Sequence, residues 1–349
     1  MRIDRRNFIL LAGGLHGATS NISQIDLWTQ GDRGVHTYRI PALVETKKGT
    51  LIAIVDARHD SNRDLPGRIS LVMRRSLDGG RTWRDSVTIR TVSEGGVGDP
   101  SLLVDRSNAR IWCFHAFCPQ SKPMGARVLE VHVITSDDDG LTWSAPRDLT
   151  PQLKDPSWME MFLTSGTHVQ TRRGRFLVPA AVRDATNQLT ARNAYSDDHG
   201  KTWKIGPAIG PGTDESHFVE LKDGTILQNM RSNGKRRAIA RSTDGGVNFN
   251  GFTHDEALID PSCNAGITTW GRLLVFTNAA STKREKLTMK ISKDAGRTWS
   301  TGRVLHEGPA AYSTVIPLRG GGLGVLYERG ERYAAERITF ARIEKDWLS

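Results

Sequence analysis

One eight-residue phrase recurs five times and constrains the fold of this chain more than any other feature. Its common form is Ser-x-Asp-x-Gly-x-Thr-Trp, and its copies begin at Ser76, Ser136, Ser196, Ser242 and Ser292. The Asp can accept hydrogen bonds from backbone N–H groups, the Gly can adopt positive φ, and the Trp can fill the space beneath the turn. The copies start 60, 60, 46 and 50 residues apart, a spacing typical of one supersecondary unit that stacks beside its neighbours. Each copy is therefore predicted to be an anchored hairpin turn in a repeat-built protein.

Short apolar runs between the copies indicate that each unit is a small β-sheet. The runs are bounded by Gly, Asp and Asn, and no long helical pattern competes with them. They cover residues 69–73, 131–134, 175–178, 237–240, 273–276 and 323–327. Residues 22–349 divided among six units give roughly 55 residues each, enough for four strands of about 5 or 6 residues with their loops. The sequence predicts an all-β, six-bladed β-propeller, in which one terminal blade lacks the phrase because the ring closes there.

Composition agrees with a single large domain over residues 22–349. The chain is 38% hydrophobic and 25% charged, and 35 Gly and 9 Trp suit a turn-rich protein. No linker or low-complexity tract divides it. No apolar stretch reaches the ~18 to 20 residues needed to span a bilayer. We therefore expect no membrane span.

The first 21 residues resemble an export signal. Arg5 and Arg6 precede a short apolar run that ends in small residues near Gly17, which is similar to a bacterial twin-arginine signal. The alternative is a disordered basic N-terminus, because the apolar run is short and rich in Gly. We expect residues 1–21 to direct export, so that the mature protein is periplasmic or extracellular.

The net charge of +10, from 48 Lys and Arg against 38 Asp and Glu, favours acidic ligands. Residues 1–21 contribute three Arg and one Asp, so the remaining domain keeps 10 − 2 = +8. Nucleic acid is disfavoured as a partner because the cations are scattered, and the densest group, residues 235–237, is only three long. Acidic glycans are the better match.

Three cysteines, Cys113, Cys118 and Cys263, cannot all be paired within the chain, and no His/Cys spacing resembles a zinc site. We expect no structural dependence on disulfides, although a Cys113–Cys118 bridge across a turn stays open.

The tetrapeptide Tyr-Arg-Ile-Pro at residues 38–41, followed by the repeated phrase, resembles the bacterial sialidase (exo-α-neuraminidase) family, whose Asp boxes have this form. The resemblance covers essentially the whole chain after residue 22. It implies that the box carboxylates lie at the blade periphery and are structural. These are Asp78, Asp138, Asp198, Asp244 and Asp294. The fourth box ends in Asn248-Phe249 instead of Thr-Trp, which we expect to weaken that turn.

The resemblance implies a carboxylate-binding triad formed by Arg39, Arg231 and Arg284. Sialic acids carry a carboxylate on the anomeric carbon, and guanidinium groups bind carboxylates bidentately while staying charged. Arg58 matches a family position that contacts the substituents of the sugar ring. Glu328 matches a carboxylate that holds the first arginine in place.

The implied nucleophile is Tyr312, with Glu215 as its base. A carboxylate nucleophile would be repelled by the substrate's own carboxylate, so a neutral phenol activated by a neighbouring base is favoured, and sialidases are known for a Tyr nucleophile. The ordinary phenol pKa of about 10 makes such a base necessary at neutral pH.

The acid/base is expected among three carboxylates of residues 56–66, namely Asp56, Asp60 and Asp64. The resemblance favours Asp64, about two dozen positions after the first arginine, with Asp60 as the fallback. Such an acid must be protonated near the working pH, which we expect a partly closed, desolvated site to provide.

These residues imply a retaining exo-sialidase that hydrolyses terminal α-linked sialic acids from glycoconjugates without a metal or organic cofactor. Two alternatives stay open: a related glycosidase acting on Kdn, Kdo or another ulosonic acid, and a non-catalytic Asp-box propeller that binds glycans. The first would differ only in the pocket for the C5 substituent. Candidate residues for that pocket are Asp99, Trp112, Phe117, Met124 and Trp158.

Overall fold

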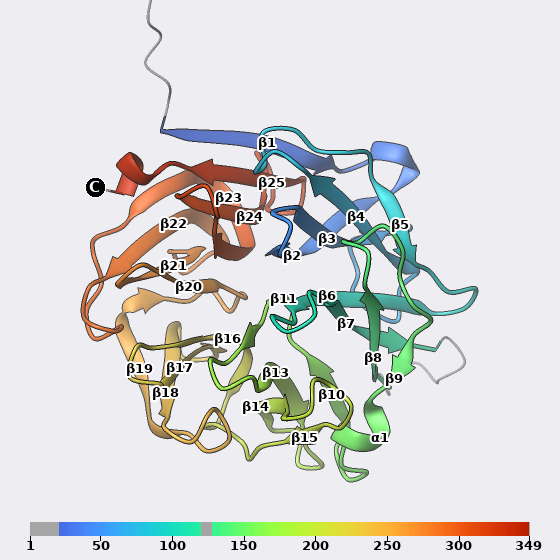
Figure 1. Cartoon of the computed structure of the whole chain (residues 1–349), viewed down its shortest axis with the longest axis vertical. Coiled ribbons are helices and arrows are strands. Elements are labelled where there is room, and N and C mark those ends of the chain that lie inside the picture. The colour runs from blue at the N-terminus through green and yellow to red at the C-terminus, as the bar shows by residue number, and fades with distance from the viewer. Residues whose placement is uncertain (1–20, 120–127, 349) are drawn as a thin grey trace, which may run out of the picture.

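The strands of the computed structural model are arranged around a central axis as six blades of a β-propeller (Figure 1). The structure describes residues 21–119 and 128–348. The predicted export signal at residues 1–21 therefore lies outside the described residues, apart from Asn21. In the described part, the helices are single turns: η1 (Asp32–Gly34), α1 (Thr150–Leu153) and η2 (Lys345–Leu348). None of them is long and apolar enough to cross a membrane.

Each blade is built on antiparallel strand pairs, and its inner strand lies near the axis (Figure 1). Blade 1 contains β2 (Thr37–Glu45), β3 (Leu51–Arg58), β4 (Ile69–Ser76) and β5 (Val87–Arg90). Blade 2 contains β6 (Gly96–Val104), β7 (Ile111–Cys118), β8 (Glu130–Ser136) and β9 (Arg147–Asp148), with β11 (Gly166–Thr167) parallel to β6. Blade 3 contains β10 (Glu160–Leu163), β12 (Val169–Gln170), β13 (Phe176–Arg183), β14 (Leu189–Ser196) and β15 (Lys204–Ile205).

Blade 4 contains β16 (Thr213–Glu220), β17 (Ile226–Ser232), β18 (Arg236–Ser242) and β19 (Asn250–Ile259). Blade 5 contains β20 (Gly266–Trp270), β21 (Leu273–Ala279), β22 (Glu285–Ser292) and the first part of β23 (Arg303–Pro317). Blade 6 contains the rest of β23, β24 (Leu323–Arg329), β25 (Arg337–Ile343) and β1 (Ile22–Thr29). All six apolar runs singled out in the sequence lie in strands, the run at residues 175–178 starting one residue before β13.

The ring closes by pairing the first strand of the chain with the last. β1 runs antiparallel to β25, from Ile22 opposite Ile343 to Thr29 opposite Arg337. In the other five blades the Asp box is the turn that joins the third strand to the fourth. Because no peptide link joins β25 to β1, the sixth blade has no such turn. This accounts for five boxes in a six-bladed ring, as the sequence predicted.

The box carboxylates organise their turns through a repeated set of hydrogen bonds. In the second box, Ser136 donates to Asp138 at 2.8 Å, and the Thr142 amide and hydroxyl donate to the same carboxylate at 2.8 and 2.5 Å. These bonds, led by the Thr142 hydroxyl, lower the pKa of Asp138 to about 2. None of the five box carboxylates lines the central pocket described below.

The fourth box is an exception to what its sequence suggested. The Asn248 side-chain amide donates to Asp244 at 2.8 Å, and the Asn248 backbone N–H donates to it at 3.1 Å. The amide therefore replaces the usual Thr hydroxyl, and the expectation of a weakened turn is wrong as far as hydrogen bonds are concerned. The neighbouring Phe249 packs against apolar side chains as the Trp residues of other boxes do.

Each box also docks onto the preceding blade. A Cβ added at Gly80, where φ is +89°, would lie 2.2 Å from Phe340 of blade 6, and one at Gly140 would lie 2.7 Å from Ile52 of blade 1. Trp83 meets the same Phe340 edge-on, with ring centroids 5.0 Å apart. The box Gly is thus required both for its backbone conformation and for the close approach of two blades.

All three cysteines are buried, and none forms a disulfide. Cys113 and Cys118 lie on the same strand, β7, where they pair with Leu102 and Gly96 of β6. The bridge that the sequence left open is therefore absent.

We expect Gly80→Ala to destabilise the fold more than Gly224→Ala. Both glycines have φ close to +90°, but a Cβ at Gly224 has no heavy atom within 4 Å. The two variants share the strain of positive φ, so their difference isolates the contact with Phe340, which should lower the free energy of unfolding by about 1–3 kcal/mol. Urea denaturation measures both values, and equal losses would show that the box does not dock as described.

Candidate functional site

The innermost strands of four blades depart from regular pairing at the points where they meet the central pocket. Bulges of this kind re-aim side chains and are frequent beside functional sites. Two of them contain a non-Gly residue with positive φ, Ile40 at +62° and Asp99 at +56°. The irregular positions lie between Arg39 and Ala42, Gly98 and Ser101, Thr213 and Ser216, and Ala310 and Ser313.

The pocket that these strands surround has a volume of about 210 Å³. One side is polar and strongly charged, and the other is largely apolar. The polar side is formed by Asp64, Asp99, Asp214, Glu215, Arg231 and Tyr312. Blade 3 forms the other side with Phe162, Ala181 and Leu189, and with Glu160 and Arg183 beside them, whereas Ile40 packs against Tyr312.

The Tyr312 phenol forms the centre of the polar side. Its hydroxyl donates to Glu215 at 2.6 Å, and Arg231 Nη1 lies 2.6 Å from the same carboxylate oxygen and 3.1 Å from the phenol oxygen. Burial, followed by the charge of Glu215, raises the pKa of Tyr312 well above its ordinary value, although Arg231 opposes the shift. The phenol is therefore neutral at rest and already hydrogen-bonded to a base that can take its proton.

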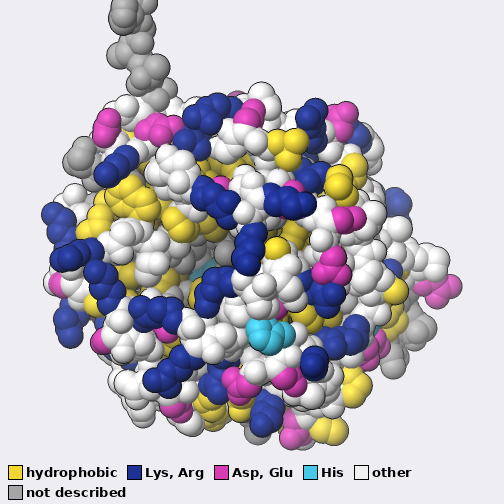
Figure 2. All heavy atoms as spheres, viewed as in Figure 1, with side chains coloured by type: hydrophobic (Ala, Val, Ile, Leu, Met, Phe, Trp, Pro, Cys, Tyr) yellow, Lys and Arg dark blue, Asp and Glu magenta, His cyan; other side chains and the backbone are white. Residues whose placement is uncertain are grey.

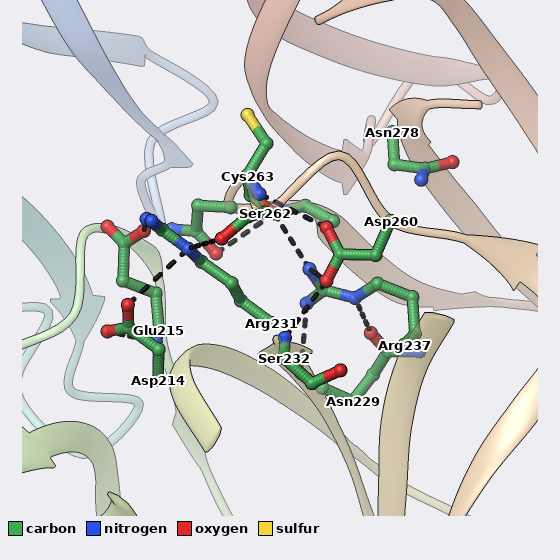
Figure 3. Close-up of polar contacts among 12 residues, drawn as sticks. Asp214, Glu215, Asn229, Arg231, Ser232, Arg237, Asp260, Ser262, Cys263 and Asn278 are labelled. Carbon is green, nitrogen blue, oxygen red and sulfur yellow. Dashed lines mark hydrogen bonds and ion pairs between the residues drawn. The ribbon is translucent and has the colours of Figure 1, made fainter. Parts of the chain in front are cut away.

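The structure brings the three predicted arginines together around this ring. The Cζ atoms of Arg39 and Arg284 lie 5.1 and 5.7 Å from the ring centroid, and Arg231 contacts the hydroxyl. They come from blade 1, from the loop before β22 in blade 5, and from blade 4. Figure 3 shows how Arg231 extends from β17 toward Asp214, Glu215 and Ser262. Residues up to 245 positions apart in sequence are thus gathered around one phenol ring, and of the three arginines Arg231 lines the pocket itself.

Glu328 holds Arg39 against the phenol. Its two carboxylate oxygens accept from Arg39 Nε and Nη2 at 3.0 and 3.1 Å, and also from the backbone N–H groups of Ile40 and Tyr312 at 2.9 and 3.3 Å. The Glu328 side chain is completely buried. Burial by itself would lower the pKa of Arg39, but the charge of Glu328 raises it above its ordinary value. One carboxylate therefore positions both a triad arginine and the backbone of the tyrosine.

Asp64 lies on the loop between β3 and β4, beside two guanidinium groups. Its carboxylate is 2.6 Å from Arg58 Nη1 and 4.0 Å from Arg39 Nη1, and its side chain is 64% exposed. The expectation of a desolvated Asp64 is therefore wrong for the protein alone. The fallback Asp60 pairs with Arg68 on the exposed surface and does not line the pocket.

Arg58 is placed differently from what the resemblance implied. Its side chain is only 2% exposed and lies beneath Asp64, held by Asp56 at 3.1 Å and by the Asn62 carbonyl at 3.0 Å. It does not line the pocket. Arg58 is therefore placed to orient Asp64, and its contact with the substituents of a sugar ring stays a prediction.

Three further carboxylates surround the site; the sequence analysis named Asp56 as an acid/base candidate and Asp99 as a candidate lining residue, but it did not name Asp214. Burial raises the pKa of Asp56 to about 6, against the opposing charge of Arg58. Burial and then the charge of Glu215 raise the pKa of Asp214 to about 6. Burial and then Asp56 raise the pKa of Asp99 well above its ordinary value. For Asp214, the one signal available in the sequence was its position directly before Glu215.

Most of the aromatic residues proposed for the C5 pocket lie elsewhere. Trp112 is buried between blades 2 and 3, where it contacts Gly200, and Phe117 packs against His132 with ring centroids 5.0 Å apart. Trp158 stacks under Arg192, whose Cζ lies 4.6 Å from the ring centroid. Met124 lies outside the described residues. Of the four candidates within the described residues, Asp99 alone lines the pocket.

One group within residues 21–119 and 128–348 has the chemistry and spacing of metal ligands. It consists of Glu130, His132 and Asp148, whose ligand atoms lie within 4.8 Å of one another. These residues belong to β8 and β9 of blade 2, and none of them lines the pocket. The polar groups of the pocket are arginine, tyrosine and carboxylate groups.

The fold and the site together define a protein of the sialidase type. The sequence matches the family described as BNR repeat-like domain over residues 95–325. A sialidase from Micromonospora viridifaciens is 39% identical over 356 residues, covering 93% of this chain and 54% of that protein. A sialidase from Bacteroides fragilis (strain YCH46) is 33% identical over 331 residues, covering 85% of this chain and 61% of that protein.

A solved structure leads to the same assignment. The Hadza microbial sialidase Hz136 is 31% identical and superposes with a TM-score of 0.86, covering 93% of this chain and 69% of that one. The present chain spans about half the length of the Micromonospora relative. It belongs to the bacterial sialidase family.

We expect Glu328→Gln to destabilise the protein strongly. The substitution leaves the buried Arg39 cation with the distant Asp64 carboxylate, 4.0 Å away, as its charged partner, and turns an amide N–H group toward a guanidinium. Breaking a buried pair in this way lowers the free energy of unfolding by about 3–5 kcal/mol, which urea denaturation can measure.

The matched control is Glu256→Gln. Glu256 also pairs with an arginine, Arg236, but its side chain is 84% exposed, so the loss should stay below about 1 kcal/mol. Similar losses in the two variants would contradict the role assigned to Glu328.

Proposed function

We propose that the protein is a retaining exo-sialidase that releases terminal α-linked sialic acids from glycoconjugates through a covalent tyrosyl intermediate. The observation that carries this proposal is the buried Tyr312 phenol, 2.6 Å from Glu215 and surrounded by Arg39, Arg231 and Arg284. A buried phenol bonded to a base is a nucleophile with a proton acceptor, and the three cations are suited to a carboxylate.

Substrate binding depends on the triad. The guanidinium groups bind the carboxylate on the anomeric carbon, so that this carbon lies over the phenol oxygen. Because Glu328 already occupies one edge of the Arg39 guanidinium, only its other edge is left for the ligand. This pre-set orientation reduces the free energy needed to order the site on binding.

In the first displacement, Tyr312 Oη attacks the anomeric carbon and its proton passes to Glu215. The bond from that carbon to the aglycone oxygen breaks, and Asp64 donates a proton to the departing oxygen. The products are the free aglycone alcohol and a tyrosyl glycoside. Arg231, in contact with both Glu215 and the phenol oxygen, stabilises the negative charge that develops on the phenol.

In the second displacement, water attacks the anomeric carbon from the side that the aglycone has left. Asp64 accepts the proton of the water, the bond to Tyr312 breaks, and the phenolate takes its proton back from Glu215. Two inversions give net retention. Asp64 has to be protonated for the first step although it is exposed and lies beside Arg58, so a bound sugar that covers it supplies the desolvation that favours the neutral acid.

The apolar wall of the pocket favours an N-acetyl group at C5 over a hydroxyl group. Phe162, Ala181 and Leu189 offer a methyl group an apolar surface, whereas the hydroxyl groups of Kdn or Kdo would leave it unused. Sialic acids are therefore proposed as the preferred substrates, and sialylated glycans as partners. Nucleic acid is not proposed, because Lys and Arg side chains are distributed over this face without forming one continuous patch (Figure 2).

Hydrolysis of a fluorogenic sialoside tests the proposal, with Kdn and Kdo glycosides beside it. We expect turnover of the sialoside by the wild type and a loss of at least about 10³-fold in kcat for Tyr312→Phe, which lacks the nucleophile. The matched control is Tyr195→Phe, a peripheral tyrosine that stacks with Arg175. Its activity should stay at the wild-type level.

Three results would each contradict a part of the proposal. Equal turnover by the wild type and Tyr312→Phe would remove the tyrosine from the mechanism. Binding of sialosides without turnover of any substrate in the panel would favour the non-catalytic glycan-binding alternative, and faster turnover of Kdn or Kdo glycosides would favour the ulosonic-acid alternative.

We further propose that residues 1–21 act as a twin-arginine signal and that the domain from residue 22 onward works in the periplasm or outside the cell. Support comes from Arg5 and Arg6 ahead of a short apolar run. Changing both to Lys keeps the charge but removes the paired guanidinium groups, so the exported fraction should fall to background. Unchanged export, measured by fractionation and immunoblotting, would favour the simple basic N-terminus.

A further inference from the structure

A fully buried ion pair lies directly behind the arginine triad. Arg237, the last residue of the basic run at 235–237, has no exposed side-chain surface, and neither has its partner Asp260. Arg237 donates to Asn229 Oδ1 at 2.7 Å, to Asp260 Oδ2 at 3.2 Å and to the Cys263 carbonyl at 2.7 Å (Figure 3). A cation in this position has no part in binding an external ligand, so its role must lie in what it holds.

Asp260 extends the pair to the backbone beside the triad. Its Oδ2 accepts from the N–H group of Ser232 at 3.0 Å, and its Oδ1 accepts from the N–H group of Cys263 at 3.1 Å. Ser232 directly follows Arg231 in β17. The pair therefore joins the end of the strand that carries Arg231 to the turn formed by residues 260–263.

That turn contacts two of the three triad arginines through one residue. Ser262 Oγ accepts from Arg231 Nε at 3.1 Å, and the Ser262 carbonyl accepts from Arg284 Nη2 at 2.9 Å. Ser262 has φ of +59°, a left-handed conformation that is strained for serine and persists only when the surroundings enforce it. Two hydrogen bonds hold this conformation in place: Arg237 donates to the Cys263 carbonyl, and the Cys263 N–H group donates to Asp260.

We propose that the Arg237–Asp260 pair is a positioning device for the carboxylate clamp, acting through Ser262. The pair holds the turn in its strained conformation, and the turn then sets the separation and the facing edges of the Arg231 and Arg284 guanidinium groups. A buried ion pair contributes little net stability compared with apolar residues of similar volume. Its effect is therefore expected on ligand affinity and not on folding. This inference rests on the proposed sialidase function.

Two variants test it from opposite ends of the network. Ser262→Gly removes the hydroxyl acceptor but suits positive φ, so Tm should stay unchanged or rise while KM for the fluorogenic sialoside increases about tenfold. The double variant Arg237→Met, Asp260→Leu replaces the pair with apolar groups, and we expect a similar rise in KM with Tm within a few degrees of the wild type. Combining all three changes should add little to the KM of either, because they break one network.

The control is Arg75→Met, which breaks the ion pair with Asp139 between blades 1 and 2. A merely structural role predicts the behaviour of this control, a lower Tm with unchanged KM. Calorimetric titration with free sialic acid gives a second measure of affinity that does not depend on turnover.

The outcomes separate the two proposals. Unchanged KM and unchanged sialic acid affinity in both test variants, with an active wild type, would overturn the positioning role and leave the sialidase function intact. A wild type that neither hydrolyses sialosides nor binds sialic acid would overturn both. Failure of the double variant to fold still leaves Ser262→Gly, whose unchanged affinity would by itself overturn the inference.

Discussion

Closure of the ring by β1 and β25 is the constraint on which the rest of the structure depends. It fixes blade 1 beside blade 6 and so brings Arg39 within 3.0 Å of Glu328, 289 residues later in the chain. Without closure, Arg39 would lose the carboxylate that binds it through two hydrogen bonds, and Tyr312 would lose the carboxylate that accepts its backbone N–H group. The pairing of β1 with β25 and the buried carboxylate of Glu328 therefore determine both the stability of the ring and the geometry of the pocket.

The propeller keeps its structural and chemical groups apart. At the periphery, five boxes repeat the same hydrogen bonds and hold neighbouring blades through glycine contacts, as at Gly80 and Phe340. At the axis, the inner strands bulge and each presents a different side chain. A repeated periphery can tolerate a change such as Asn248, because its amide supplies the missing donor. The groups at the axis cannot be exchanged in this way, because each of them occurs once and has its own partners.

The resemblance identified the residues that meet at the pocket, but it misjudged two of their settings. Arg58 lies beneath Asp64, and Asp64 is exposed, because the loop between β3 and β4 turns the carboxylate outward over the arginine. The aromatic candidates failed for a related reason. Whether Trp112 faces the pocket or the space between blades depends on strand register, and register places it against Gly200. No local pattern in a single sequence carries that information.

The repeat spacing and the turn chemistry of each box determined the all-β class, the blade count and the missing sixth box. The turn chemistry depends on residues a few positions apart, and the spacing of the boxes can be counted along the chain. The neighbours of each arginine were decided only by the tertiary structure, which joins Arg231 to Ser262 and to the buried pair of Arg237 and Asp260. It also shifted the pKa values of buried groups, raising those of Tyr312 and Asp99. Burial and the charges of residues distant in sequence cause those shifts, and neither exists until the ring has closed.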